Sequence, residues 1–186
     1  GASGERVVSA VILGVSGSVS VYKACDLASQ LTQAGHSVHT VMTQRAATLV
    51  SPQLFEAVTS EAPYVDEFSE SRRGAMDHIE LARRAELFLV APMTGDLAAK
   101  LALGIADDLL TTVSLAVAAG TPRLACPAMN PTMLAHPAVQ RNLATLVEDG
   151  WEVMEPGTGH MACGEEGAGR LPEPAEILAR AGELLG

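Results

Sequence analysis

Aromatic residues and lysine are both scarce in this chain. Phe, Trp and Tyr make up 3% of its 186 residues, lysine occurs only at positions 23 and 100, and the net charge is −10. Such a composition argues against nucleic-acid and anionic-membrane surfaces, both of which need clusters of basic side chains. Apolar residues nevertheless form 48% of the chain. Ala, Leu and Val must therefore build the core, as is typical of helices packed on a buried parallel sheet.

Long apolar runs, a signal sequence and paired cysteines are also missing. No run approaches the roughly 20 residues of a membrane span, and the start GASGERVVSA has no signal-peptide core. We interpret residues 1–5 as a tag remnant or a disordered start. Cys25, Cys126 and Cys163 are odd in number and irregularly spaced, so neither a disulfide framework nor a metal site is expected. These features predict a soluble, cytoplasmic single domain over residues 1–186.

Buried-strand patterns and helical patterns alternate along the chain. This alternation predicts an α/β fold with a doubly wound parallel sheet of five or six strands. The segment 157–170 has five glycines and no periodicity, which predicts a loop. The predicted strands are 7–13 (ending at Gly14), 37–42, 62–66, 87–91, 123–126 and 151–154. The predicted helices are 19–33, 45–58 (with a break at 51–52), 78–85, 97–103, 107–119, 139–148 and 174–185.

Ligands of open parallel sheets bind beyond the carboxyl ends of the strands, and two polar turns follow the first two strands. Ser16, Gly17 and Ser18 can bind phosphate through hydroxyl groups and helix N-terminal N–H groups. They can equally form a tight turn with a serine cap. No acidic residue follows the second strand, which disfavours a dinucleotide. Thr43 there suits a mononucleotide phosphate, or simply caps the next helix.

Later segments carry candidate reactive groups, each with a structural alternative. Thr94 and Asp96 can face a heteroaromatic ring or cap a helix. Asn130 can donate two hydrogen bonds to a carboxylate, or make an Asx turn beside core methionines. His78 can act as a base or serve only packing. Cys163, among glycines, indicates a cover that carries a reactive thiol.

Four motifs taken together resemble the homo-oligomeric flavin-containing cysteine decarboxylases, over residues 7–185. The most specific is the family's P-x-M-N-x-x-M, which is Pro127-Ala128-Met129-Asn130-Pro131-Thr132-Met133 in this chain. The turn Ser16 to Val19 is similar to the family's FMN phosphate loop. His78-Ile79-Glu80-Leu81 is similar to the segment with the catalytic histidine. Ala162-Cys163-Gly164, with Gly-x-Gly-Arg downstream, is similar to the substrate-covering flap.

The resemblance implies a fold, a cofactor and an assembly. The fold would be a single flavodoxin-like, three-layer domain, with 157–170 as the substrate flap. FMN would bind at a subunit interface of a homotrimer or homododecamer. His78 would be the base, Asn130 would hold the substrate carboxylate beside Met133, and Cys163 would contact the substrate and donate a proton. The implied cofactor-binding residues are Ser16, Gly17, Ser18, Val19, Thr43, Thr94, Gly95, Asp96 and Ala128.

Two departures from the family's pattern bear on the chemistry. Asp96 replaces an asparagine beside the flavin, and its charge would disfavour a reduced flavin anion unless it is protonated or turned away. Leu134 stands where many members have tryptophan.

The family has two branches, which oxidise and decarboxylate different cysteine-ending substrates. The chain ends near Leu185, whereas bacterial coenzyme A enzymes usually continue into a fused synthetase domain. Asp96 and the scarcity of lysines also fit poorly with a phosphorylated substrate. We therefore favour the C-terminal cysteine of a ribosomal peptide natural-product precursor, giving an aminoenethiol. The first alternative is phosphopantothenoylcysteine in coenzyme A biosynthesis, which the Cys163 flap favours. A non-catalytic flavoprotein regulatory subunit is the second, and prenylated-flavin synthesis ranks last.

Overall fold

A five-stranded parallel sheet forms the centre of the computed structural model, which describes residues 8–65, 77–160 and 166–186. The strand order is β2-β1-β3-β4-β5, the flavodoxin-like order, in which the chain reverses direction across the sheet between β1 and β3. The predicted doubly wound fold is thereby confirmed. The strands are β1 (Ala10–Val15), β2 (Ser37–Met42), β3 (Leu87–Met93), β4 (Arg123–Pro127) and β5 (Trp151–Val153).

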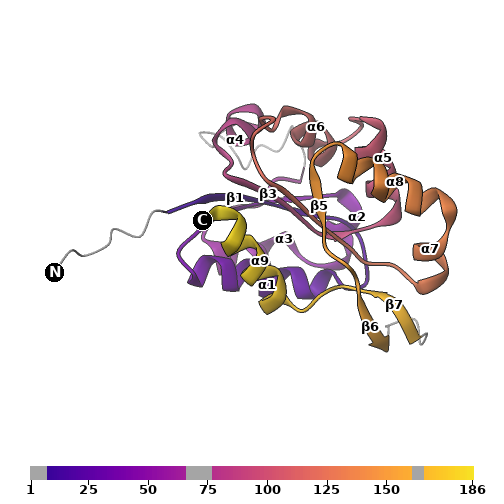
Figure 1. Cartoon of the computed structure of the whole chain (residues 1–186). Coiled ribbons are helices and arrows are strands. Elements are labelled where there is room, and N and C mark those ends of the chain that lie inside the picture. Colours follow the sequence, from indigo (N-terminus) through magenta and orange to yellow (C-terminus); the bar gives the residue numbers. More distant parts are fainter. Residues whose placement is uncertain (1–7, 66–76, 161–165) are drawn as a thin grey trace.

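Helices cover both faces of the sheet and make three layers (Figure 1). Because alternate residues of a strand point to opposite faces, Val11 packs with Phe55 and Ile177 on one side, and Ile12 packs with Leu110 on the other. The first face carries α1 (Val21–Gln33), α3 (Pro52–Thr59) and α9 (Pro174–Leu185). The second carries α4 (His78–Arg84), α5 (Gly95–Leu103), α6 (Leu109–Ala116) and α8 (Pro137–Glu148). Two short helices, α2 (Gln44–Leu49) and α7 (Pro131–Ala135), follow the ends of β2 and β4.

The first strand does not end where the sequence predicts. Gly14 lies inside β1, paired with Val41 and Val90 of the neighbouring strands. A Cβ atom at Gly14 would lie 2.8 Å from the Leu110 side chain. The glycine therefore lets α6 pack closely on the sheet, and does not terminate the strand.

The prediction of a loop over 157–170 is wrong for residues 157–160 and 166–170, the parts of this segment that the structure describes. Gly157–His160 (β6) and Glu166–Arg170 (β7) pair as an antiparallel hairpin. Gly167 and Gly169 have φ values of +135° and +129°, which favour glycine. Of the predicted strand 62–66, the described residues 62–65 form only an isolated bridge, between Val41 and Tyr64.

Two interpretations fall outside the described residues: the tag remnant at 1–5, and the position of Cys163. Across the described ranges, no helix is long and apolar enough to cross a membrane. Nor does any group of three His, Cys, Asp or Glu side chains in that part of the chain have an arrangement that could hold a metal ion.

Candidate functional site

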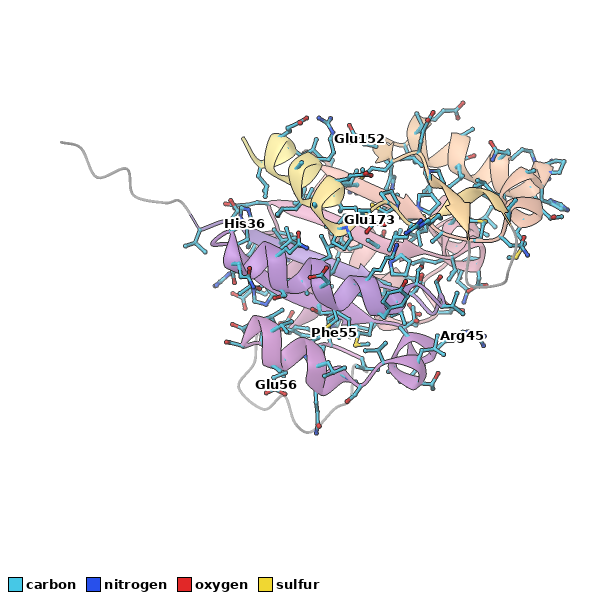
Figure 2. All side chains as sticks on the ribbon, turned by 90° about the horizontal axis from the view of Figure 1, so that it is seen from below. His36, Arg45, Phe55, Glu56, Glu152 and Glu173 are labelled. Carbon is cyan, nitrogen blue, oxygen red and sulfur yellow. The ribbon has the colours of Figure 1, made fainter. Side chains whose placement is uncertain are left out.

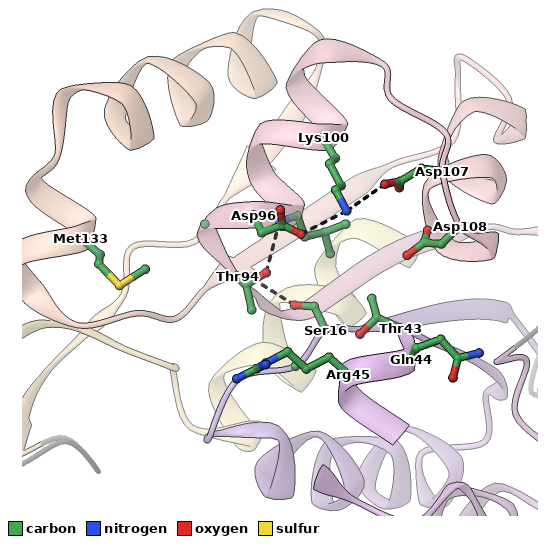
Figure 3. A pocket seen from close by; sticks show the side chains of 13 residues that line it. Ser16, Thr43, Gln44, Arg45, Thr94, Asp96, Lys100, Asp107, Asp108 and Met133 are labelled. Atoms are coloured by element: carbon green, nitrogen blue, oxygen red, sulfur yellow. Dashed lines mark hydrogen bonds and ion pairs between the residues drawn. The ribbon is translucent and has the colours of Figure 1, made fainter. Parts of the chain in front are cut away.

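A cavity of about 420 Å³ opens beyond the carboxyl ends of β1, β2 and β3 (Figure 3). It lies where the strand order reverses between β1 and β3, the position at which flavodoxin-like sheets bind ligands. The volume is within the usual range for small-molecule sites. The lining comes from the first three strand ends, α5, the segment before α6, and α7: Ser16, Gly17, Thr43, Gln44, Arg45, Thr94, Gly95, Asp96, Leu97, Lys100, Asp107, Asp108 and Met133.

Ser16 braces two of the loops that form this cavity. Its hydroxyl donates to the carbonyl of Pro92 at 2.6 Å and accepts from the backbone N–H of Thr94 at 3.0 Å. The residue is 1% exposed, and Figure 3 shows its contact with Thr94. Because the single hydroxyl proton is already donated, Ser16 can hold the two loops at a fixed distance but has no side-chain donor left for a ligand.

Gly17 allows a close approach between the turn after β1 and the start of α2. A Cβ atom at this position would lie 2.4 Å from Cγ and 2.8 Å from Cβ of Arg45. These atoms are near the root of the arginine side chain, so they have little freedom to move aside. Only glycine fits beneath Arg45 without displacing it.

Thr43 and Thr94 combine the two roles that the sequence leaves open for them. Thr43 Oγ1 accepts from the N–H of Ala46 at 3.1 Å, and Thr94 Oγ1 accepts from the N–H of Leu97 at 3.2 Å. Both therefore cap helices, α2 and α5 respectively. A hydroxyl that accepts a capping bond still carries a proton to donate. Each threonine can thus cap its helix and bind a ligand in the cavity.

Asp96 forms an ion pair at the rim of the cavity. Its carboxylate lies 3.3 Å from Lys100 Nζ, which also lies 3.1 Å from a carboxylate oxygen of Asp107. The hydrogen bond that Lys100 donates to Asp107, followed by the one that it donates to Asp96, raises the pKa of Lys100. The Asp96 side chain is 76% exposed. Its charge is therefore turned toward solvent and offset by a cation held on the same helix.

Three other predicted cofactor-binding residues, Ser18, Val19 and Ala128, do not line this cavity. Ser18 Oγ lies 2.8 Å from Ser20 Oγ, and the next residue, Val19, is 68% exposed. Ala128 is buried, and its N–H donates to the carbonyl of Met93 at 3.1 Å. This bond ties the loop after β4 to the end of β3, next to the cavity.

The asparagine loop is joined to the β6–β7 hairpin. Asn130 Oδ1 accepts from the N–H of Met133 at 2.8 Å and caps α7, so the side-chain NH₂ group keeps its two donors. The N–H of Met129 donates to the carbonyl of Gly169 at 3.0 Å. A Cβ atom at Gly169 would lie 2.1 Å from the carbonyl oxygen of Met129. The base of the predicted flap is thereby fixed against the loop that carries Asn130.

His78 begins α4 and is not among the cavity-lining residues. Asp77 caps this helix by accepting from the N–H groups of Ile79 at 2.8 Å and Glu80 at 2.9 Å. The bond from Glu80, assisted by that from Ile79, lowers the pKa of the Asp77 carboxyl. One copy of the chain thus brings the predicted FMN residues Gly17, Thr43, Thr94, Gly95 and Asp96 together with Met133, but does not add His78 to the cavity lining.

Apart from Asp96, sequence reasoning missed the charged residues around the cavity. Arg45 directly follows the polar segment that marks Thr43, and Lys100 lies four residues after Asp96, a spacing that places two side chains on the same helix face. These two signals could have identified the cations. Asp107 and Asp108 precede α6, and only the fold places them beside α5.

Comparison with known proteins gives a consistent picture. Residues 2–185 match the family model described as Flavoprotein. The coenzyme A biosynthesis bifunctional protein CoaBC of Bacillus subtilis (strain 168) is 48% identical over 168 residues, which is 90% of this chain and 41% of that protein. The chain therefore spans about two-fifths of the length of this curated relative.

Solved structures of cysteine decarboxylases resemble the fold over nearly their full length. A mutant PPC decarboxylase complexed with pantothenoylaminoethenethiol has a TM-score of 0.83 at 27% identity, covering 95% of this chain and 97% of that one. The FMN-dependent cysteine decarboxylase SpaF has a TM-score of 0.79 at 33% identity, covering 97% and 98%. The resemblance found in the motifs, and with it the prediction of a flavin-binding family, is confirmed: the chain belongs to the flavoprotein family.

Proposed function

We propose that this chain binds FMN in the cavity at the β1–β3 reversal and decarboxylates a substrate that ends in a cysteine carboxylate. The observation that carries the proposal is the cavity itself, where a glycine cradle and two threonine hydroxyls surround the position at which this fold takes a mononucleotide. Membership of the flavoprotein family and the similarity to FMN-dependent SpaF support the choice of cofactor.

The residues present fit a flavin mononucleotide. Gly17 leaves a hollow that a Cβ atom would fill, and Thr43 and Thr94 each retain a hydroxyl proton for a phosphate or ring acceptor. Gly95 and Asp96 begin α5, where backbone N–H groups have no partner within the helix. These groups would hold the nucleotide, while Ser16 keeps the loops apart.

The chain's own groups would bind, orient and transfer protons around the cysteine end. When bound, FMN would supply the capacity to accept a hydride, which carries two electrons and one proton, from the carbon that bears the thiol. The thiol would lose its proton, and the carboxylate would then lie β to a C=S bond and could leave as CO₂. The Asn130 amide would hold that carboxylate by hydrogen bonds, and His78 would accept the thiol proton. Cys163, outside the described residues, would return a proton to the product.

For the substrate, we favour phosphopantothenoylcysteine over a peptide. The chain is 48% identical to CoaBC over 168 residues, which supports a role in coenzyme A biosynthesis. This reverses the preference drawn from the sequence, which depended on the position of the C-terminus, on Asp96 and on the scarcity of lysines. The argument from the C-terminus is set aside, and the identity to CoaBC outweighs the other two. The similarity to SpaF keeps a peptide ending in cysteine as the competing substrate.

Two measurements test the proposal. The purified protein should show a flavin absorption spectrum, and mass analysis of the released cofactor should identify FMN. Incubation with phosphopantothenoylcysteine, and separately with peptides ending in cysteine, should give CO₂ loss only from the former. If the product has lost only CO₂, the enethiol has been reduced to the saturated thiol before release. If the product has also lost two hydrogens, it is the free enethiol. A flavin-containing protein that decarboxylates neither substrate would support a regulatory flavoprotein instead.

A further inference from the structure

Two cations line the cavity, and they differ in their surroundings. Lys100 lies between the carboxylates of Asp96 and Asp107, so its charge is offset twice. The guanidinium of Arg45 has no hydrogen-bond or ion-pair partner within residues 8–65, 77–160 and 166–186. Within the part of the chain that the structure describes, no acidic side chain pairs with the positive charge that Arg45 places at the cavity.

The position of Arg45 is set by the chain on both sides of it. The Thr43 cap fixes the start of α2, and Gly17 lies directly under Cβ, Cγ and Cδ of the arginine, where an added Cβ would approach to 2.4–2.8 Å. Figure 3 shows the side chain extending from α2 past Ser16, at the side of the cavity away from Asp107 and Asp108. Figure 2 shows Arg45 at the opposite end of the molecule from His36, which precedes β2.

The charge around the cavity is consequently polarised. The side formed by the ends of β1 and β2 offers Arg45, the Thr43 hydroxyl and the backbone at Gly17. The side formed by α5 and the segment before α6 carries three carboxylates and one ammonium group. A dianionic phosphate is repelled by the second side and attracted by the first. A guanidinium is well suited to such a group, because its fork of N–H donors can bind two phosphate oxygens at once.

We propose that Arg45 recognises the terminal phosphate of the flavin nucleotide, and so makes the cavity select FMN over the uncharged riboflavin. The inference rests on the proposed function, since it takes a flavin to be the ligand. The proposal also fixes the orientation of the flavin nucleotide in the cavity. The phosphate lies at the ends of β1 and β2, and the ring lies toward Thr94, Met133 and the Asn130 loop.

Flavin titrations of the apoprotein test this assignment, with quenching of flavin fluorescence as the readout. The wild-type protein should bind FMN more tightly than riboflavin. In Arg45→Gln the dissociation constant for FMN should rise about tenfold or more, the usual worth of a hydrogen bond to a charged group. The constant for riboflavin should change less than about twofold, within the range of a neutral surface substitution. Arg45→Lys should recover part of the preference, and added salt should weaken FMN binding more in the wild type than in Arg45→Gln.

Two further variants separate a phosphate contact from a general effect on the cavity. Gly17→Ala should push Arg45 aside and also reduce the preference for FMN, although Arg45 is still present. Lys100→Gln removes the other, already offset cation, and should leave the ratio of the FMN and riboflavin constants within about twofold of the wild type.

The outcomes distinguish this inference from the proposed function. If the wild-type protein binds both flavins equally, or Arg45→Gln weakens both by the same factor or neither, the role of Arg45 is wrong while the flavin site stands. If Lys100→Gln lowers the preference as much as Arg45→Gln, only the overall charge matters and the assignment to Arg45 fails. If the wild-type protein takes up neither flavin, both the inference and the proposed function fall.

Discussion

At the scale of single residues, the ion pair of Asp96 bears on an expectation from the sequence. A carboxylate beside a flavin should disfavour the reduced anion, unless it is protonated or turned away. Asp96 is turned toward solvent and paired with Lys100, which Asp107 holds in place. The lysine thus offsets a charge that would otherwise act on a flavin ring bound in the cavity, so an aspartate can be accommodated at this position.

Replacing Lys100 by glutamine should therefore make the reduction potential of the bound flavin more negative. We expect a shift on the order of 10–30 mV, because the pair is largely exposed and solvent screens it. Potentiometric titration of the flavin absorbance measures this directly. The double variant Asp96→Asn/Lys100→Gln should return to the wild-type potential. Equal shifts in the single and double variants would mean that Lys100 acts on the flavin independently of Asp96.

Asn130 offers a test of carboxylate binding that does not disturb the fold. Asn130→Asp keeps a side chain able to cap α7, because aspartate is an equally good N-cap. It replaces the amide donors by a negative charge facing a negatively charged substrate. Turnover should fall by about a hundredfold or more, while flavin content and thermal stability stay close to wild type. Full activity in this variant would exclude Asn130 from substrate binding.

At the scale of helices and strands, the accuracy of prediction followed the range of the interactions. The bounds of β2 and α9 were predicted correctly, because alternation and helical periodicity are local signals. The β6–β7 hairpin was missed because it has no apolar alternation, and its β7 strand is positioned by the Met129–Gly169 bond, which joins segments 40 residues apart. The candidate site divides in the same way: its strand-end residues could be predicted, whereas Asp107 and Asp108 could not.

The hairpin can be tested through Gly169. An alanine there would adopt an unfavourable positive φ and bring Cβ within 2.1 Å of the Met129 carbonyl. We expect Gly169→Ala to lower the free energy of unfolding by about 1–3 kcal/mol, or to detach the hairpin from the asparagine loop. Urea denaturation measures the former, and limited proteolysis near the hairpin detects the latter.

Gly182, in the last turn of α9, provides the matched control. No atom lies within 4 Å of a Cβ placed there, and the backbone is helical. Gly182→Ala should therefore stabilise the protein by about 0.5–1 kcal/mol. The reasoning for Gly169 would be contradicted if both variants changed stability equally and left the hairpin in place.

At the scale of the whole molecule, the proposed base His78 is not among the residues that line the cavity of a single chain. We propose that a second copy supplies the imidazole, in a homo-oligomer with the cavity at the interface between subunits. Homo-oligomers usually have closed symmetry, so every subunit would both give and receive this residue.

Mixing inactive subunits tests this arrangement. His78→Asn and Asn130→Asp should each be inactive alone, but when co-expressed in equal amounts they should form some sites with both native residues. Activity should recover to about a quarter of wild type if the two residues come from different subunits. As a control, the double variant His78→Asn/Asn130→Asp should be co-expressed in equal amounts with the wild type. This mixture should also have about a quarter of the wild-type activity, whereas it would have about a half if one subunit supplied both residues. Mixtures with no activity would place His78 and Asn130 in the same subunit's site.

The bond between Met129 and Gly169 would also constrain how product leaves the proposed site. It joins strand β7 of the hairpin to the loop that carries Asn130. Movement of the hairpin away from the asparagine loop would either break this hydrogen bond or move the loop with it. In the second case, entry of solvent and loss of the contact with the carboxylate would occur in one motion.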